Sequence, residues 1–247
     1  MADAVLDALG ELVRPAGDAD AVAGVLARYV ATPANTEQAA AVVRAAAAHD
    51  LAVVVRGAGT KLDWGPPPRR LDLMIDTRRL SGVVEHAAGD LVVVVRAGTT
   101  LEELAAKLSP QQLAIDIPLP GATVGGTVAA NASGPRRLLY GTIRDLLIGV
   151  TVVRPDGVVA HSGGKVVKNV AGYDLGKLMT GSYGTLGLVT ECAFRLHPLP
   201  TVAAVVRQRV ETVWEAGLLV TSVRRSQVVP SALELNAPPD GDVEIGV

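Results

Sequence analysis

The sequence is poor in aromatic residues, and this shortage limits how its core can be built. Only 3% of the 247 residues are aromatic, with Phe194 as the single phenylalanine, although 49% are hydrophobic. Alanine and valine supply most of that hydrophobic fraction, so we expect a core of small and β-branched side chains. The composition is typical of a soluble globular protein, and its 26 glycines direct attention to where glycine clusters.

An excess of charge, paired cysteines and long hydrophobic runs are also missing. A net charge of −2 argues against a broad nucleic-acid-binding surface, which needs a basic stripe. Cys192 has no cysteine to pair with, which fits a reducing compartment. There is no signal-peptide pattern and no run near the roughly 18–20 apolar residues of a membrane span. We expect a cytoplasmic protein without a transmembrane segment, peripheral to a membrane only through partner subunits.

Predicted helices and strands alternate along the chain. Asn35 with Gln38 predicts a capped helix that runs to residue 48, and Thr99 and Thr100 predict two overlapping capping boxes for a helix over 101–108. We expect strands at residues 51–56, 71–76, 83–87, 91–96, 146–153, 158–161, 188–196 and 202–210, and further helices at residues 1–30, 128–132 and 211–225. This interleaving predicts an α+β or mixed α/β fold.

Three of these predictions concern burial and the chain ends. The continuous apolar run at 51–55 is typical of a buried strand. The alternation at 71–76 is typical of an edge or half-buried strand. After residue 225 we expect a tail rich in proline, glycine and aspartate without regular structure.

Glycine clusters in three segments, at residues 57–61, 118–127 and 163–187. Glycine permits positive φ and close approach to a ligand, and consecutive main-chain N–H groups in such turns bind anions such as a diphosphate. Val159 and Val166 exclude a P-loop, and Leu62 stands where a Rossmann motif needs glycine. The alternative for each cluster alone is that it only makes turns and bulges.

Seven strings of residues follow one another in a recognisable order. They are residues 56–61, 122–127, 131–134, 140–141, 144–145, 168–175 and 181–187. Over roughly residues 30–200 the chain resembles the FAD-binding (PCMH-type) domain of the vanillyl-alcohol oxidase / p-cresol methylhydroxylase flavoprotein family. Four further stretches, at 60–65, 85–90, 134–137 and 194–198, most resemble the FAD-binding second subunit of bacterial glycolate oxidase complexes.

The resemblance implies a two-subdomain α+β fold and a division of the chain. An N-terminal helical segment would occupy residues 1–30, and the FAD-binding domain residues 31–200. Its subdomains would cover about 31–88 and 89–200. Residues 201–247 would begin a substrate-binding cap domain, since Pro198 and Pro200 suit a boundary.

The resemblance also assigns candidate FAD-binding residues. The first loop would wrap the diphosphate, the next segments would contact the flavin, and the last turn would face the adenosine half. The residues are Arg56, Gly57, Ala58, Gly59, Thr60, Lys61, Pro120, Gly121, Ala122, Thr123, Gly125, Gly126, Asn131, Ser133, Gly134, Tyr140, Gly141, Asp145, Gly172, Tyr173, Asp174, Gly181, Gly184, Thr185, Gly187 and Val189. No histidine or cysteine lies near the first loop, so we predict non-covalent FAD.

Other polar residues have weaker claims to a functional role. The four histidines are scattered at residues 49, 86, 161 and 197, so we predict no metal site. Cys192 is interpreted as a buried structural thiol. Asp145 and Arg144 either pair with each other or brace the flavin loop, and we favour a structural role. Lys165 and Lys168 either approach the flavin or lie solvated on a loop. Neither tryptophan is assigned a stacking role.

The family resemblance implies oxidation of a small 2-hydroxy acid, of the glycolate or D-lactate type. That reaction needs a cation for the carboxylate and a base for the hydroxyl proton, and we nominate no catalytic residue. One hypothesis is an enzyme subunit that passes electrons to a sister flavin subunit, an iron–sulfur subunit or a quinone. The alternative is a non-catalytic FAD-binding assembly or electron-relay subunit of such a complex.

Overall fold

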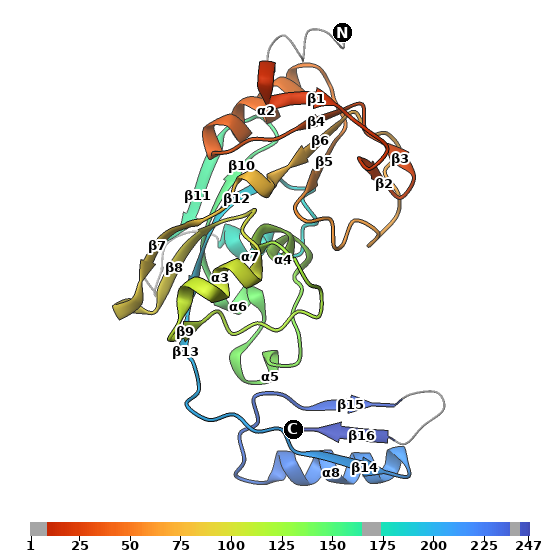
Figure 1. The fold of residues 1–247 in the computed structure, drawn as a ribbon, viewed down its shortest axis with the longest axis vertical. Coiled ribbons are helices and arrows are strands. Elements are labelled where there is room, and N and C mark those ends of the chain that lie inside the picture. The colour runs from red at the N-terminus through yellow and green to blue at the C-terminus, as the bar shows by residue number, and fades with distance from the viewer. Residues whose placement is uncertain (1–8, 165–173, 238–242) are drawn as a thin grey trace.

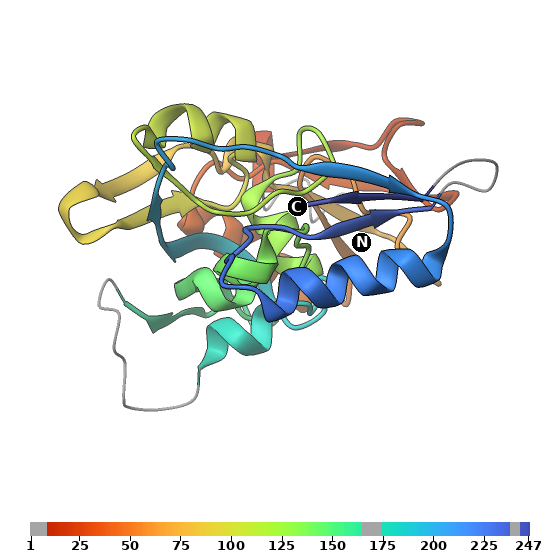
Figure 2. The same ribbon diagram turned by 90° about the horizontal axis from the view of Figure 1, so that it is seen from below.

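The computed structural model describes residues 9–164, 174–237 and 243–247, and its three main sheets follow one another along the long axis (Figure 1). The N-terminal sheet lies at one end and the largest sheet in the middle. A small C-terminal sheet with one helix closes the other end, where Figure 2 shows it from below. The fold class is therefore mixed helix and sheet, as predicted.

The N-terminal sheet has four strands in the order β1-β4-β6-β5. They are β1 (Val13–Pro15), β4 (Tyr29–Ala31), β5 (Val53–Arg56) and β6 (Leu73–Asp76). β1 pairs antiparallel with β4, whereas β4 and β5 each run parallel to β6. β4 and β5 thus run in the same direction on either side of β6, and helix α2 (Thr36–Ala48) connects the end of β4 to the start of β5. The short helix η1 (Gly10–Leu12) precedes the sheet.

The predicted cap of α2 is confirmed. The side chain of Asn35 accepts from the main-chain N–H of Gln38 at 2.8 Å, and the Gln38 side chain accepts from the N–H of Ala34 at 2.8 Å. These two bonds satisfy donors that the first turn of a helix leaves free. Ala39 and Val42 on the buried face of α2 pack in one cluster with Ile75.

The middle sheet is antiparallel and has the order β11-β10-β12-β8-β7. Its strands are β7 (Val83–Ala87), β8 (Val92–Arg96), β10 (Leu147–Val153), β11 (Val159–Gly163) and β12 (Leu188–Arg195). The predicted strand pairs β7–β8 and β10–β11 are both present. The short helices η2 (Thr77–Arg79) and η3 (Ala88–Asp90) lie before and after β7.

Helices cover one face of the middle sheet. They are α3 (Leu101–Leu108), α4 (Val124–Ala130), α6 (Ile143–Leu146) and α7 (Leu175–Met179), with α5 (Arg137–Tyr140) nearby. Phe194 on β12 is fully buried among residues of α3, α4 and α6. Thr100 and Glu103 form the predicted capping box of α3. The second predicted box is wrong, because Thr99 Oγ1 instead accepts from the N–H of Gly82 at 2.9 Å.

The C-terminal sheet has the order β14-β16-β15. It consists of β14 (Arg207–Val210), β15 (Glu234–Asn236) and β16 (Val243–Gly246), and helix α8 (Val213–Arg225) packs on one side of it. In Figure 1 this helix covers the side that faces away from the rest of the molecule. The bridge to this part is the pair β9 (Gln111–Gln112) and β13 (His197–Pro198).

The helix predicted for residues 1–30 is wrong in its described part. Residues 9–30 contain β1, most of β4 and a hairpin of β2 (Ala21–Val22) with β3 (Val25–Leu26). Pro15 has no N–H to donate, and Gly24 has a φ of 83°, so both oppose a helix. Because β1 pairs with β4, this segment is part of the N-terminal sheet and does not precede it as a separate unit.

Four further expectations are corrected. β6 is the central strand, buried along its whole length between β4 and β5, whereas β5 is an edge strand whose Val53 is exposed. Sequence alternation misled here, because Asp72 and Asp76 are buried and paired with arginine. Of the strand predicted at residues 202–210, only residues 207–210 form a strand, β14. The tail after residue 225 was expected to be irregular, but it contains β15 and β16.

Cys192 provides a test of the middle sheet. Its side chain is buried in the main core cluster, and burial, followed by the charge of Glu191, raises the pKa of its thiol. We expect the Cys192 thiol of the native protein to be unreactive toward a thiol reagent at pH 8. In the unfolded protein, one thiol per chain should react. A colorimetric thiol titration checks this, and rapid labelling of the native state would contradict the packing of β12.

Candidate functional site

The first predicted loop, residues 57–61, follows directly after β5. In the described part of the structure, most of its main-chain N–H groups are free to bind a ligand. Gly59 has a φ of 82°, a conformation that side-chain-bearing residues rarely adopt. Within the described part of the chain, the N–H groups of residues 58–61 donate to no protein acceptor. The loop therefore presents several unused main-chain donors on one short turn, an arrangement that suits an anion.

The second predicted turn lies directly against this loop. Thr123 is the N-cap of α4, and its Oγ1 accepts from the N–H of Gly126 at 3.3 Å. A Cβ on Gly57 would collide with the same Thr123 Oγ1. Only glycine at position 57 allows the N-terminal sheet and α4 to approach so closely.

A pocket of about 620 Å³ opens where these two segments meet. This volume is within the range of ligand pockets. The first loop contributes to it all along its length, α4 contributes Ala129 and Ala130, and the chain after α7 contributes Tyr183 and Thr185. The other lining residues are Val22, Val54, Val55, Leu62, Trp64, Gly65, Pro66, Pro68, Thr123 and Gly126.

Among the described residues that line this pocket, Lys61 alone carries a charge opposite to that of a phosphate. Its Nζ lies 3.2 Å from Thr60 Oγ1. Burial lowers the pKa of the Lys61 ammonium, because the charged form loses part of its hydration. An anion in the pocket would restore the favourable environment of that charge.

The third predicted segment, residues 181–187, is attached to the end of α4. The N–H of Gly181 donates to Val128 O at 3.0 Å, and the N–H of Tyr183 donates to Ala129 O at 2.8 Å. Gly184, Thr185 and Gly187 line a second pocket of about 360 Å³ beside α2. The two pockets share Val55 and Thr185, so they adjoin each other.

The structure thus brings eight of the predicted residues into the first pocket and three into the second. The eight are Gly57, Ala58, Gly59, Thr60, Lys61, Thr123, Gly126 and Thr185, and the three are Gly184, Thr185 and Gly187. Arg56 lies just before the loop, but its guanidinium points toward Asp20 and Asp76. Gly172 and Tyr173 lie outside the described residues.

Four predicted residues between the end of α4 and the end of α5 line neither pocket and make structural contacts. Asn131 ends α4 with a φ of 48°, and Ser133 Oγ accepts from the N–H of Ile143 at 3.2 Å. Gly134 lies against the main chain of Asp116. The ring of Tyr140 packs edge-on against His197, with centroids 4.9 Å apart.

The remaining predicted residues also lie outside the two pockets. Asp145 accepts from the N–H and the Oγ1 of Thr142 at 2.8 and 2.7 Å, and these bonds lower the pKa of its carboxyl. Asp174 is the N-cap of α7. The others are Pro120, Gly121, Ala122, Gly125, Gly141, Gly181 and Val189, which lie in turns, helices or strands around the site.

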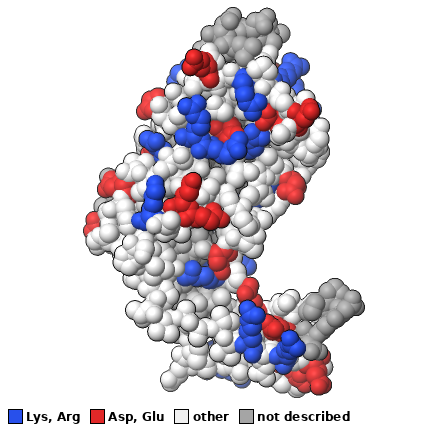
Figure 3. Space-filling model, viewed as in Figure 1, with Lys and Arg blue, Asp and Glu red and all other residues white. Residues whose placement is uncertain are grey.

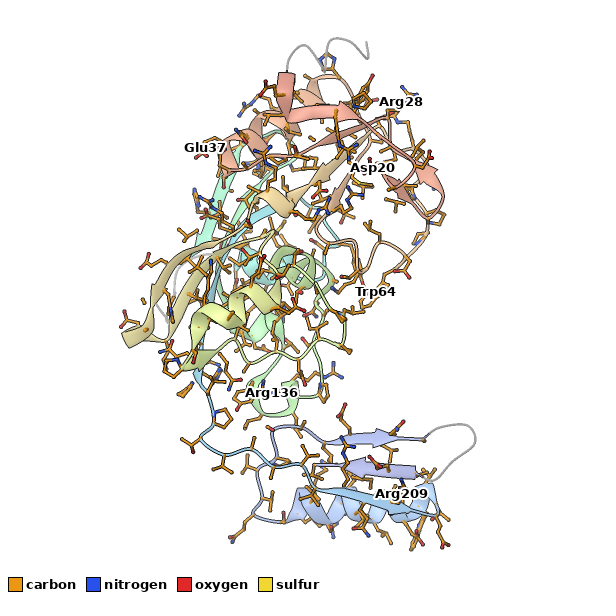
Figure 4. The ribbon with its side chains drawn as sticks, in the orientation of Figure 1. Asp20, Arg28, Glu37, Trp64, Arg136 and Arg209 are labelled. Atoms are coloured by element: carbon orange, nitrogen blue, oxygen red, sulfur yellow. The ribbon has the colours of Figure 1, made fainter. Side chains whose placement is uncertain are left out.

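Sequence reasoning missed two sides of the first pocket. Trp64, whose exposed fraction is 45%, lies on the proline-rich loop that descends beside α4, as Figure 4 shows. Val22, on the N-terminal hairpin, also lines the pocket. The three prolines after Trp64 could have predicted a rigid loop beside the pocket. The residues around Val22 form no pattern that would have predicted its position there.

Two absences apply to the described residues alone. No three histidine, cysteine, aspartate or glutamate side chains among them gather as ligands of a metal ion. No helix within residues 9–164, 174–237 and 243–247 has both the length and the hydropathy to cross a membrane.

The sequence model of the FAD binding domain matches residues 27–163. The chain belongs to this family of FAD-binding domains. FAD is therefore its cofactor, and the glycine loop and pockets described above lie within or beside the matched region. The match confirms two predictions made from the sequence, namely the family and the cofactor FAD.

Three relatives show how far the similarity extends. Glycolate oxidase subunit GlcD of Bacillus subtilis is 32% identical over 212 residues, which cover 83% of this chain and 44% of that protein. D-lactate dehydrogenase of Archaeoglobus fulgidus is 35% identical, with 83% and 46% covered. Glycolate oxidase subunit GlcE of Escherichia coli is 38% identical, with 64% and 46% covered. The chain spans less than half the length of each.

Solved structures support the fold. Alkyldihydroxyacetonephosphate synthase superposes with a TM-score of 0.75 at 24% identity, covering 85% of this chain and 39% of that one. Phl p 4.0202, a glucose dehydrogenase, superposes with a TM-score of 0.76 at 18% identity, covering 98% and 55%. At these identities the similarity concerns the fold alone.

The residues present fit FAD. The unused main-chain donors of the first loop and the Lys61 ammonium match a diphosphate. The two adjoining pockets suit the two halves of an elongated dinucleotide. Glycine at position 57 leaves space that any side chain would fill.

The Gly57 contact gives a direct test of the site. We expect Gly57→Ala to raise the Kd for FAD about tenfold, roughly 1.4 kcal/mol, because its Cβ pushes the loop away from Thr123. In a Thr123→Ala background the same change should weaken binding less, since the colliding hydroxyl is gone. FAD titration followed by flavin fluorescence measures both effects.

Gly89→Ala is the matched control, because a Cβ there meets no atom within 4 Å. It should leave the Kd for FAD unchanged. An equal effect of Gly57→Ala with and without the Thr123 hydroxyl would show that the close contact is not what positions the loop.

Proposed function

We propose that this chain is the FAD-binding part of an oxidoreductase that converts a small 2-hydroxy acid, such as glycolate or D-lactate, to the 2-oxo acid. The names of its relatives, a glycolate oxidase subunit and a D-lactate dehydrogenase, support the substrate class. The observation that carries the proposal is the open main chain of residues 58–61 at the mouth of a pocket. Electrons would pass to a sister flavin subunit, an iron–sulfur subunit or a quinone.

The chain's own residues would hold and orient the cofactor. The N–H groups of residues 58–61 and the Lys61 ammonium bind the diphosphate, and α4 closes the pocket behind it. Trp64 and Tyr183 both line this pocket and would shield part of the cofactor from water. The second pocket, lined by Gly184, Thr185 and Gly187, receives the adenosine half.

Bound FAD supplies a two-electron acceptor for the hydride that leaves the α-carbon, while a base takes the hydroxyl proton. The attachment is proposed to be non-covalent, because neither pocket is lined by a histidine or cysteine among the described residues. A covalent link would need such a nucleophile at the flavin.

A second reading is a FAD-binding assembly or electron-relay subunit. The first pocket's lining contains no carboxylate or histidine in the described part of the chain, so neither of these common proton acceptors for the substrate lies there. This favours a base contributed by a partner subunit.

The first experiment is a visible absorption spectrum of the purified protein with FAD, before and after anaerobic addition of glycolate or D-lactate. We expect flavin bands near ~450 nm that survive gel filtration and leave with the small molecules after denaturation. Bleaching by a hydroxy acid supports the enzyme subunit, whereas an oxidised spectrum that changes only in the full complex supports the relay subunit. Flavin that stays on the denatured chain would contradict non-covalent attachment.

Tryptophan emission offers an independent check of where FAD lies. Trp64 lines the first pocket, whereas Trp214 lies on α8 in the C-terminal part. We expect FAD to quench the tryptophan emission, and we expect Trp64→Phe to remove most of that quenching. Trp214→Phe should preserve it. Equal quenching in the two variants would place the flavin elsewhere.

A further inference from the structure

An ion-paired cluster lies directly behind the first glycine loop. Arg56 is the last residue of β5, and its Nη2 lies 2.9 Å from Asp20 Oδ1 and 2.9 Å from Asp76 Oδ2. The side chains of Arg56, Asp20 and Asp76 have exposed fractions of only 12%, 5% and 4%. One guanidinium therefore joins two buried carboxylates from different segments immediately before Gly57.

Asp20 belongs to the N-terminal segment, which precedes the region matched by the family's sequence model. Its Oδ2 accepts from the N–H of Gly17 at 3.0 Å and from Arg14 Nη1 at 2.8 Å. Its main-chain oxygen accepts from the N–H of Ala27 at 3.0 Å. Asp20 thus holds both ends of the β2–β3 hairpin, whose Val22 lines the first pocket.

Arg56 is fixed from two directions. Thr77 Oγ1 donates to its main-chain oxygen at 3.1 Å. Its Nε is buried and has no acceptor among the described residues. The positive charge of Arg56 is therefore balanced by the carboxylates of Asp20 and Asp76. Asp76 is also bound by Arg78, through the Nη2–Oδ2 contact of 2.6 Å. Without Asp20, Arg56 would therefore share one carboxylate with Arg78.

We propose that Asp20 is a positioning residue for the diphosphate of FAD, acting through Arg56 on the loop and through the hairpin on the wall that carries Val22. Arg56 is covalently continuous with the loop, so the direction of its side chain restrains where residues 57–61 begin. This inference rests on the proposed FAD site. It assigns a role in cofactor binding to a segment whose Asp20 side chain and Ala19 main-chain oxygen both contact Arg56, the residue before the loop.

Figure 4 shows Asp20 on the side of the N-terminal sheet from which the Trp64 loop descends, and Figure 3 shows acidic and basic side chains interspersed over this sheet. The sheet offers a matched control. Asp72 is also buried, with a side-chain exposed fraction of 6%, and it pairs with Arg70 Nε at 2.8 Å. It immediately precedes β6, whereas Asp76 ends that strand. Asp72 therefore resembles Asp20 in burial and pairing but does not contact Arg56.

The test compares Asp20→Asn with Asp72→Asn. Both variants should have a lower melting temperature than the wild type in the absence of FAD, because each removes one charge from a buried ion pair. Only Asp20→Asn should raise the Kd for FAD, by about tenfold or more. It should also reduce the increase in melting temperature on addition of FAD. Flavin fluorescence and thermal unfolding give these two readouts without any activity assay.

A second matched pair of variants tests the same inference if an aspartate variant does not fold. Arg56→Lys keeps the charge but replaces the flat guanidinium by one ammonium, and Arg70→Lys makes the same change at the control site. Arg56→Lys should weaken FAD binding at least fivefold more than Arg70→Lys, by our estimate from the loss of one of two charge-assisted contacts.

The outcomes separate the inference from the proposal on which it rests. Wild-type protein that takes up no FAD would overturn the proposed function itself. Wild-type protein that binds FAD, together with Asp20 and Asp72 variants of equal affinity, would overturn only the positioning role of Asp20. A loss of affinity confined to the Asp20 and Arg56 variants would support it.

Discussion

The contact between Gly57 and Thr123 joins the two sheets that make up the cofactor site. Strand β5 of the N-terminal sheet delivers the glycine loop, and the middle sheet delivers α4 with Thr123 as its N-cap. Because a Cβ at position 57 would collide with Thr123, the approach of these elements depends on one missing side chain. The open main-chain donors, the pocket and its apolar walls all follow from that approach.

Small side chains allow the same closeness elsewhere in the middle sheet. A Cβ on Gly125 would lie 2.7 Å from Ala97 Cβ, so α4 approaches the end of β8 more closely than larger residues permit. The core is correspondingly rich in valine and alanine, and its single phenylalanine is fully buried. The shortage of aromatic residues in the sequence is therefore part of how this fold brings glycine turns together.

Local signals in the sequence predicted the elements that are stabilised locally. Asn35 and Thr100 cap their helices through bonds within four residues, so their pattern was sufficient. Thr99 shares the pattern of Thr100, but tertiary contact with Gly82 decides its role. The pairing of β5 with β6 and the direction of Arg56 depend on partners 20 or more residues away, which no local pattern encodes. The glycine loop was found because its string is specific, whereas Trp64 was missed because a lone aromatic has no partner in sequence.

The residues that line the pocket suit the binding of a cofactor better than the conversion of a substrate. The main-chain donors of residues 58–61 and the Lys61 ammonium suit a diphosphate, and apolar side chains contribute to the pocket's walls. A 2-hydroxy acid would also need a base of suitable pKa, and the described lining of this pocket contains no carboxylate or histidine. The C-terminal sheet covers one face with α8 and turns its other face toward the rest of the molecule in Figure 1. A division in which the N-terminal parts fix FAD and further elements bring the substrate to it accounts for both features, and it explains why one FAD-binding domain is found in relatives named for different substrates.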